Sequence, residues 1–360
     1  MVNPKHVDKI LQTAKFSRRE FLFLSGISVL FATLPACKAG QTVGEKPLAI
    51  RYATGGATPP TEIQIAIFSE FLQKEVLQHY GNEYTVNITT TKGTPEAQTL
   101  LVAEQADFAT LAFSTIATTV AKDAVPGGIS IVAGLFVDGE PGYGGNTYLV
   151  LEESGIQTAE DLRGKTLGVN ALGTAVDIIL RVYLRNNGID PNTDVKFAEV
   201  GFGAMGAALR EGRIDLGSFV HPFMDLEEQK GGVRTLFSAA EVLGPNSAVA
   251  TVARNKFLEE HPEAVRAFLD DWVRGLDWLI DENNREKAIE IMSDISKTPP
   301  ETLGLYYGKP GVDYYRNPLA CPSAQALQVG VDAMVSEGFL DQKISIAPLV
   351  DTSYLPKPCP

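Results

Sequence analysis

The sequence has few of the residues that carry metal or nucleophilic chemistry. Its 360 residues include three cysteines and four histidines, and no Cys-rich or His-x-x-His spacing favours a metal enzyme. Gly-x-Ser-x-Gly and Walker A patterns are also missing, which disfavours a serine hydrolase and a P-loop nucleotide site. A catalytic triad can still assemble from distant positions. We therefore expect a protein that is not an enzyme, with no catalytic residues, metal or cofactor.

Basic residues are scarce as well. The chain has 31 Lys and Arg against 44 Asp and Glu, a formal charge of −13. Residues 1–36 hold five basic and two acidic residues, so without them the charge becomes −13 − 3 = −16. Nucleic acids require a basic face, and anionic lipid would repel this chain. The composition thus excludes nucleic acid as a partner.

One apolar run stands near the N-terminus. Arg18 and Arg19 directly precede the apolar stretch 21–34, which ends at Leu-Pro-Ala-Cys with Cys37. A membrane span needs about 20 apolar residues, so this run is too short to span comfortably. The pattern is typical of an export signal. It resembles bacterial twin-arginine signals, and its end resembles a lipobox, in which the cysteine is acylated.

This export signal predicts where the protein is located. We expect a twin-arginine signal peptide over 1–36, lipidation of Cys37, a linker over 37–47 and a body tethered at the periplasmic or cell surface. Pro35 stands where a lipobox has a small residue, so cleavage without acylation and an uncleaved anchor stay open. Beyond this run, no apolar stretch is long enough to cross a bilayer.

The other two cysteines are Cys321 and Cys359. In an oxidising compartment they form a natural pair, and we predict a disulfide that attaches the C-terminal tail. Two free thiols remain the alternative, because the sequence does not give the distance between them.

Strand and helix patterns alternate along the body, which predicts parallel sheets covered by helices, an α/β fold. The expected strands are 48–53, 84–91, 107–111, 129–136, 166–170, 195–200, 214–220 and 248–253. The expected helices are 61–79, 95–104, 114–122, 175–187, 204–211, 262–281, 285–295 and 323–337.

The length after the signal, 360 − 36 = 324 residues, predicts two lobes. Two crossings, near 147–151 and 248–253, suggest a hinge of two segments. The expected divisions are 48–147 with 253–345 for lobe 1, 148–252 for lobe 2 and 346–360 for the tail.

Polar and glycine residues gather where expected strands pass into helices, the place where an open α/β sheet binds ligands. Backbone N–H groups and hydroxyls there can hold an anionic group. Each segment could instead be a tight turn with a helix cap. The candidate ligand-binding residues at these junctions are Thr54, Gly55, Gly56, Thr58, Ser114, Thr115, Asn170, Gly173 and Thr174.

Short motifs in a fixed order connect these junctions. They are Thr94-Pro95-Glu96-Ala97, Ala106-Asp107-Phe108-Ala109, Ser154-Gly155-Ile156, Asp161-Leu162-Arg163-Gly164-Lys165, Gly212-Arg213-Ile214-Asp215 and the run from Phe257 to Phe268. Together they resemble the extracytoplasmic substrate-binding proteins of ABC importers for nitrate, sulfonate and taurine. The resemblance covers roughly residues 48 to 282.

The resemblance implies a type II periplasmic-binding-protein fold, in which two lobes close over a solute. It implies capture of a small anionic solute, such as an aliphatic sulfonate, taurine or nitrate, by a monomer that delivers it to ABC permease and ATPase subunits. By position, residues 54–58, Ser114, Thr115, Gly173 and Thr174 would line the cleft. His221 stands where the family often has an acid between Trp and Pro, so it is a further candidate ligand residue or a surface turn residue.

Two alternatives share this fold. A sensor subunit that loads a solute and docks on a histidine kinase would have the same cleft. A pyrimidine-precursor binder or enzyme is the other, although the cysteine-rich iron site of those enzymes is missing here. Asp138 and Glu140 could contact an amine such as that of taurine, or form a solvated acidic loop.

Overall fold

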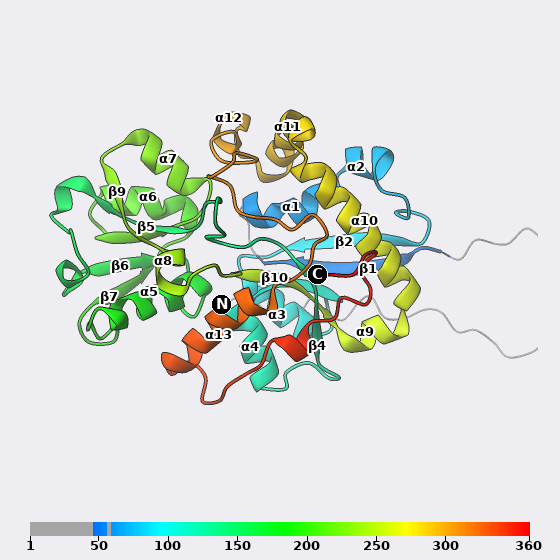
Figure 1. The fold of residues 1–360 in the computed structure, drawn as a ribbon, viewed down its shortest axis with the longest axis horizontal. Helices are drawn as coiled ribbons and strands as arrows, with labels where there is room; N and C mark the ends of the chain where they lie inside the picture. The colour runs from blue at the N-terminus through cyan, green and yellow to red at the C-terminus, as the bar shows by residue number, and fades with distance from the viewer. Residues whose placement is uncertain (1–45, 56–58) are drawn as a thin grey trace, which may run out of the picture. The chain divides into compact units, whose positions relative to one another are not determined.

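The computed structural model describes residues 46–55 and 59–360. In this part of the chain ten strands form two five-stranded sheets, and helices cover them (Figure 1). The α/β class expected from the sequence is confirmed. None of the helices in the described ranges combines the length and the apolar character needed to cross a membrane.

The first sheet has the strand order β2-β1-β3-β10-β4. Its strands are β1 (Leu48–Thr54), β2 (Tyr84–Thr90), β3 (Phe108–Ala112), β4 (Ile129–Gly134) and β10 (Val249–Arg254). Strand β1 pairs in parallel with β2 and β3, whereas β10 runs antiparallel to both of its neighbours. An all-parallel sheet was therefore the wrong expectation, because β10 enters this sheet from the other end after the chain has built the second one.

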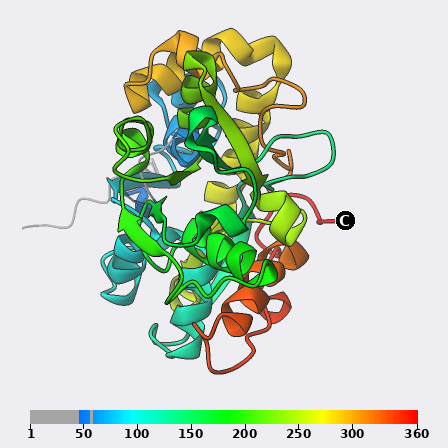
Figure 2. The same cartoon turned by 90° about the vertical axis from the view of Figure 1, so that its left-hand side faces the viewer.

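The second sheet repeats this order as β7-β6-β8-β5-β9. Its strands are β5 (Thr147–Leu151), β6 (Thr166–Val169), β7 (Lys196–Glu199), β8 (Leu216–Phe219) and β9 (Val233–Ser238). Here β5, the strand that arrives from the first sheet, is antiparallel to β8 and β9. Figure 2 views the chain with the green elements of this sheet nearest the reader.

The helices of the first half are α1 (Pro59–Ile67), α2 (Glu70–Glu75), α3 (Thr94–Val102), α4 (Phe113–Ala121), α5 (Ala175–Asn186) and α6 (Phe202–Arg210). Those of the second half are α7 (Phe223–Lys230), α8 (Ala239–Leu243), α9 (Asn255–Glu260), α10 (Pro262–Ile280), α11 (Arg285–Ser296), α12 (Pro300–Leu303) and α13 (Ala324–Ser336). The single helix expected over 61–79 is two helices. Ser69 separates them, because its hydroxyl accepts a hydrogen bond from the Leu72 N–H at 3.4 Å and caps α2.

The two sheets carry different cores. Beside the first sheet, Trp272 and Phe268 of α10 pack on Tyr52 of β1 and Phe108 of β3, with ring centroids 4.7 to 5.6 Å apart for the Phe108–Phe268 and Tyr52–Trp272 pairs. The second sheet has two smaller clusters, one of them built around Phe237. Aromatic packing is therefore concentrated on the first sheet.

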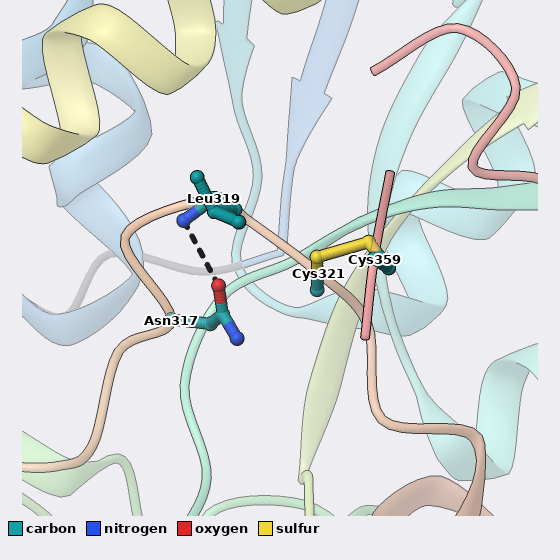
Figure 3. Close-up of a disulfide and its surroundings, with 4 residues drawn as sticks. All are labelled: Asn317, Leu319, Cys321 and Cys359. Atoms are coloured by element: carbon teal, nitrogen blue, oxygen red, sulfur yellow. Dashed lines mark hydrogen bonds between the residues drawn. A yellow bond between two sulfur atoms is a disulfide. The ribbon is translucent and has the colours of Figure 1, made fainter. Parts of the chain in front are cut away.

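Cys321 and Cys359 form a disulfide that closes a sequence separation of 38 residues (Figure 3). Beside it, the Leu319 N–H donates to Asn317 Oδ1 at 2.9 Å. The tail also pairs with the edge of the first sheet, since the Asp351 N–H donates to the carbonyl of Ile131 in β4 at 3.0 Å. The structure thus brings together the two cysteines that the sequence suggested as a pair.

The lobe limits remain a prediction. Strand β10 spans the expected limit between residues 252 and 253, and all of it pairs in the first sheet. The signal peptide, the lipidation of Cys37 and most of the linker over 37–47 lie outside the described residues.

Candidate solute-binding cavity

A cavity of about 270 Å³ is lined by residues that follow strands of both sheets. Most of the lining comes from strand-to-helix junctions, where parallel strands place their carboxyl ends. The lining residues from these junctions are Gly55, Lys92, Gly93, Thr94, Pro95, Asn170, Ala171, Thr174, Ala175, Val176, Gly201, Phe202, Gly203, Val220 and Phe223. The crossing segments and the chain near α12 add Phe136, Asn146, Ala248, Val249 and Tyr314.

Helices α5 and α6 begin at this cavity. Thr174 is the N-cap of α5 and Gly201 that of α6, and both line it. The first amides of a helix have no acceptor within the helix, and the helix dipole places partial positive charge there. The amides of Ala175 and Phe202 are thus available to an anion.

The charge of the lining differs from that of the chain. Among the described residues that line the cavity, Lys92 is the one charged side chain, and none is Asp or Glu. The whole chain carries a formal charge of −13. A negatively charged solute therefore meets donors here, whereas most of the acidic residues lie elsewhere.

Asn146 presents donors to the cavity from a buried position. Asn146 is 3% exposed, and its Oδ1 accepts a hydrogen bond from the Tyr314 hydroxyl at 2.5 Å. That hydroxyl in turn accepts from the His221 N–H at 3.5 Å. Because Tyr314 occupies Oδ1, the amide nitrogen Nδ2 keeps its two N–H groups, and it has no acceptor among the described residues.

Asn170 is held in a related way on the second sheet. The Thr174 hydroxyl lies 2.8 Å from Asn170 Oδ1 and 2.7 Å from the carbonyl of Ala171. Donation to Oδ1 leaves Nδ2 of Asn170 as a second amide donor at the cavity. The single hydroxyl proton of Thr174 is used within the protein, at Asn170 Oδ1 or at the Ala171 carbonyl.

Two aromatic pairs complete the lining. Phe136 and Tyr314 stack with ring centroids 4.5 Å apart and an angle of 28° between planes. Phe202 and Phe223, at the starts of α6 and α7, lie 6.4 Å apart at 14°. The cavity thus combines a few amide donors with a mostly apolar wall, as ligand sites commonly do.

Gly55 is required at the cavity wall by close packing. A Cβ at this position would lie 2.8 Å from the Thr110 carbonyl oxygen and 2.8 Å from Thr94 Cγ2. Any larger residue would push β1 away from its neighbours, so the backbone can approach the cavity here only as glycine.

Of the candidate ligand residues from the sequence, Gly55, Asn170 and Thr174 line the cavity. Thr54, Ser114 and Thr115 are buried and do not line it. The Thr115 hydroxyl donates to the carbonyl of Ala112 at 3.0 Å, and the hydroxyls of the other two have no partner among the described residues.

Gly56 and Thr58 lie outside the described residues. Gly173 is described, but it lies at a different hollow beside α13. Its N–H donates to the buried carboxylate of Asp177 at 2.7 Å, so this amide is not available to a solute.

His221 is neither a ligand residue of this cavity nor a surface turn residue. It is fully buried, its Nδ1 lies 2.6 Å from Asp225 Oδ2 and its Nε2 lies 3.0 Å from the carbonyl of Val312. Both ring nitrogens thus face protein acceptors, and the ring stacks on Tyr306 at 4.5 Å. The ring thus joins the end of β8 to the segment after α12, and the peptide bond from His221 to Pro222 is cis.

A solvated acidic loop was the wrong expectation for Asp138. Its side chain is fully buried, and its carboxylate accepts from the Asn146 N–H at 3.1 Å. Burial raises the pKa of Asp138 to about 7. It does not line the cavity, so it offers no partner to an amine there.

The sequence reasoning missed two junctions that its own rule covers. Lys92 to Pro95 follow β2, and Gly201 to Gly203 follow β7, but neither segment was among the predicted ligand residues. Applying the rule to every strand would have found them. Asn146 and Tyr314 had no such signal, because they reach the cavity from irregular segments.

The fold and the cavity define a type II periplasmic-binding-protein fold, with two sheets of the same order and a solute cavity lined from both. A solved structure supports this class. The periplasmic aliphatic sulphonate binding protein SsuA from Escherichia coli matches with a TM-score of 0.64 and 18% identity over 84% of this chain and 90% of that one.

The chain belongs to the NMT1-like family, whose model matches residues 52–293. A putative aliphatic sulfonates-binding protein of Bacillus subtilis is 26% identical over 218 residues, 61% of this chain and 64% of that protein. The nitrate/nitrite binding protein NrtA of Nostoc is 26% identical over 145 residues, 40% of this chain and 33% of its own length. The chain thus matches less than two thirds of the length of either curated relative. These matches confirm the family suggested by the sequence motifs.

Proposed function

We propose that this protein is the solute-binding component of an ABC import system and captures a small organic anion. The observation that best supports this proposal is the cavity, where helices α5 and α6 begin and where the described lining includes no carboxylate. Such a site stabilises negative charge through amide donors and helix dipoles. The relatives named for sulfonate and nitrate binding support an anionic solute.

Binding would work through closure of two lobes. In this proposal lobe 1 holds the first sheet, lobe 2 holds the second, and the crossings before β5 and before β10 are the hinge. The amides of Asn146 and Asn170, from a crossing and from the second sheet, would both donate to the anion as the lobes close. The proposed role is binding without catalysis.

The proposed location follows from the start of the chain. An exported body, tethered through Cys37 or released, would meet its permease and ATPase partners at the membrane, and a monomer suffices for this role. The twin-arginine route is part of the proposal. Replacing Arg18 and Arg19 by Lys should block export, measured by fractionation of the producing cells; normal export would point to the general secretory route.

Ligand titration of the purified protein tests the binding role. We expect small sulfonates or carboxylates to raise the melting temperature in a saturable way, since a ligand of the folded state stabilises it by mass action. Asn146→Ala should weaken this binding about tenfold or more, because a hydrogen bond to a charged group contributes about 1.5–3 kcal/mol. Substrate turnover without saturable anion binding would contradict the proposal.

A matched control is Ser114→Ala. Ser114 is as buried as Asn146 but lies away from the cavity lining. Its substitution should leave affinity unchanged, so equal losses from both variants would show that stability, and not the cavity, governs the result.

A further inference from the structure

We propose that the solute is an aromatic acid, a flat ring that carries one carboxylate or sulfonate group. This inference rests on the proposed binding function and specifies the ligand of the same cavity. It depends on the size of the cavity, the position of its donors and the nature of its wall.

The size excludes the smallest anions as a good fit. At about 270 Å³ the cavity is much larger than the space needed for a single water molecule. A nitrate ion has four heavy atoms and would leave most of this volume to water. A ring with an acidic group has nine or ten heavy atoms, so it displaces far more of that water.

The donors suit one acidic group. Nδ2 of Asn146 has no acceptor among the described residues, although Asn146 is only 3% exposed. Tyr314 holds the amide in this orientation through Oδ1, so the cavity receives N–H groups and no oxygen from this side chain. An acid supplies the acceptors that these groups lack, whereas a neutral hydrocarbon would leave them unpaired at a cost.

The wall suits a ring. Phe136 with Tyr314 and Phe202 with Phe223 are two stacked pairs from different parts of the chain, and all four side chains line the same cavity. Aromatic rings pack favourably on one another in offset or edge-to-face arrangements. A flat aromatic body can therefore contact both pairs.

The same lining disfavours an amino-sulfonate such as taurine. An ammonium group needs a carboxylate when it is removed from water, and the described lining includes none. Asp138 does not line the cavity, and its carboxylate accepts from the backbone N–H of Asn146. An unsubstituted aromatic acid avoids this penalty.

Calorimetric titration of the purified protein with matched probes tests the inference. Benzenesulfonate and cyclohexanesulfonate share the acidic group and the ring size, and only the first is aromatic. We expect benzenesulfonate to bind about tenfold more tightly, and nitrate and taurine at least as weakly as cyclohexanesulfonate. Benzoate in place of benzenesulfonate distinguishes a carboxylate ligand from a sulfonate ligand.

Two variants separate the wall from the donors. Phe223→Leu should reduce the preference for benzenesulfonate over cyclohexanesulfonate about threefold to tenfold, because it removes one ring and keeps an apolar side chain. Asn146→Ala should weaken both sulfonates by a similar factor and leave their ratio unchanged. A matching melting temperature for each variant would show that folding is intact.

Cyclohexanesulfonate, taurine or nitrate binding as tightly as benzenesulfonate would overturn the aromatic ligand and leave the anion-binding function standing. An unchanged ratio in Phe223→Leu would also overturn it. If no anion binds in a saturable way, both this inference and the proposed function fail.

Discussion

The first and second sheets have the same strand order, yet they are held together differently. Asp107 directly precedes β3 and Asp215 directly precedes β8, and each exchanges two hydrogen bonds with a residue of the neighbouring strand, β1 or β6. The Arg51 N–H donates to Asp107 Oδ2 at 3.0 Å and the Asp107 N–H donates back at 2.8 Å. In the second sheet the Thr166 N–H donates to Asp215 Oδ2 at 2.8 Å and the Asp215 N–H donates back at 2.7 Å.

The surroundings of the two aspartates differ. The Asp107 side chain is 2% exposed and binds the guanidinium groups of Arg51 and Arg254. That of Asp215 is 36% exposed, with the ammonium of Lys165 at 3.6 Å. Arg254 comes from β10, the strand that returns to the first sheet. The comparison teaches that one local motif becomes a buried ionic centre only where a distant strand supplies a second cation.

The largest expected effect concerns this ionic centre. Asp107→Asn should lower the free energy of unfolding by about 3 kcal/mol, because two guanidinium groups lose a buried partner. Burial alone would raise the pKa of Asp107, but the hydrogen bonds from Arg51 and Arg254 outweigh it and hold the pKa below its ordinary value. This stabilisation is therefore present at neutral pH and is lost as the pH falls through the lowered pKa. Urea denaturation measures the loss.

Asp215→Asn is the matched variant in the second sheet. It should cost about 1 kcal/mol or less, because the Asn oxygen can still accept from the Thr166 N–H and the lost ion pair is exposed and screened by solvent. Equal losses for the two variants would break the comparison and show that the backbone exchange, common to both sheets, provides the stability.

The next effect concerns the disulfide. In the described part of the chain it lies beside the first sheet, and the second sheet has none. Replacing Cys321 and Cys359 by Ala should destabilise the protein by about 2–4 kcal/mol through the freed loop in the unfolded chain. Thermal unfolding with and without reductant measures this. The double variant should not respond to reductant. If the parent protein also loses no stability on reduction, the disulfide does not stabilise it and the prediction is wrong.

The last effect depends on pH and concerns the junction between the sheets, where Asp138 is buried. Its folded pKa of about 7 exceeds its ordinary value of 3.8, so the folded state keeps a proton that the unfolded state has lost. The free energy of unfolding should therefore fall as the pH rises from 5 to 7, by about 2 kcal/mol from this group. Well above pH 7 both states are charged and this contribution is constant.

Asp138→Asn isolates this contribution. The variant should be more stable than the parent at pH 7.5, and the difference should shrink toward pH 5, measured by urea denaturation at each pH. A difference that stays constant across this range would show that Asp138 does not titrate there.

Much of the fold could be predicted from local patterns. The strands β1, β2 and β6 and the helices α5 and α10 lie within a few residues of their expected limits, because each has a clear apolar period and helix signals at its ends. Elements between β8 and β10 were missed. The residues of α7 are mostly polar, and its position is set by the contacts of Met224 with the second sheet.

The cavity was only partly predictable. Gly55, Asn170 and Thr174 follow strands, so the junction rule finds them. Asn146 and Tyr314 belong to irregular segments 168 positions apart, and their hydrogen bond exists only in the folded chain. His221 drew attention as an unusual residue at its position, but its surroundings could not be read from its neighbours in sequence.

By itself, the sequence determined the α/β class, the family, the acidic charge and the alternation of strands and helices, because these depend on composition and on periods of a few residues. The tertiary structure decided which strand is antiparallel, which aspartate gains a second cation and which side chains face the cavity. Each of these depends on residues far apart in the chain, and local preferences carry no information about which distant groups will meet.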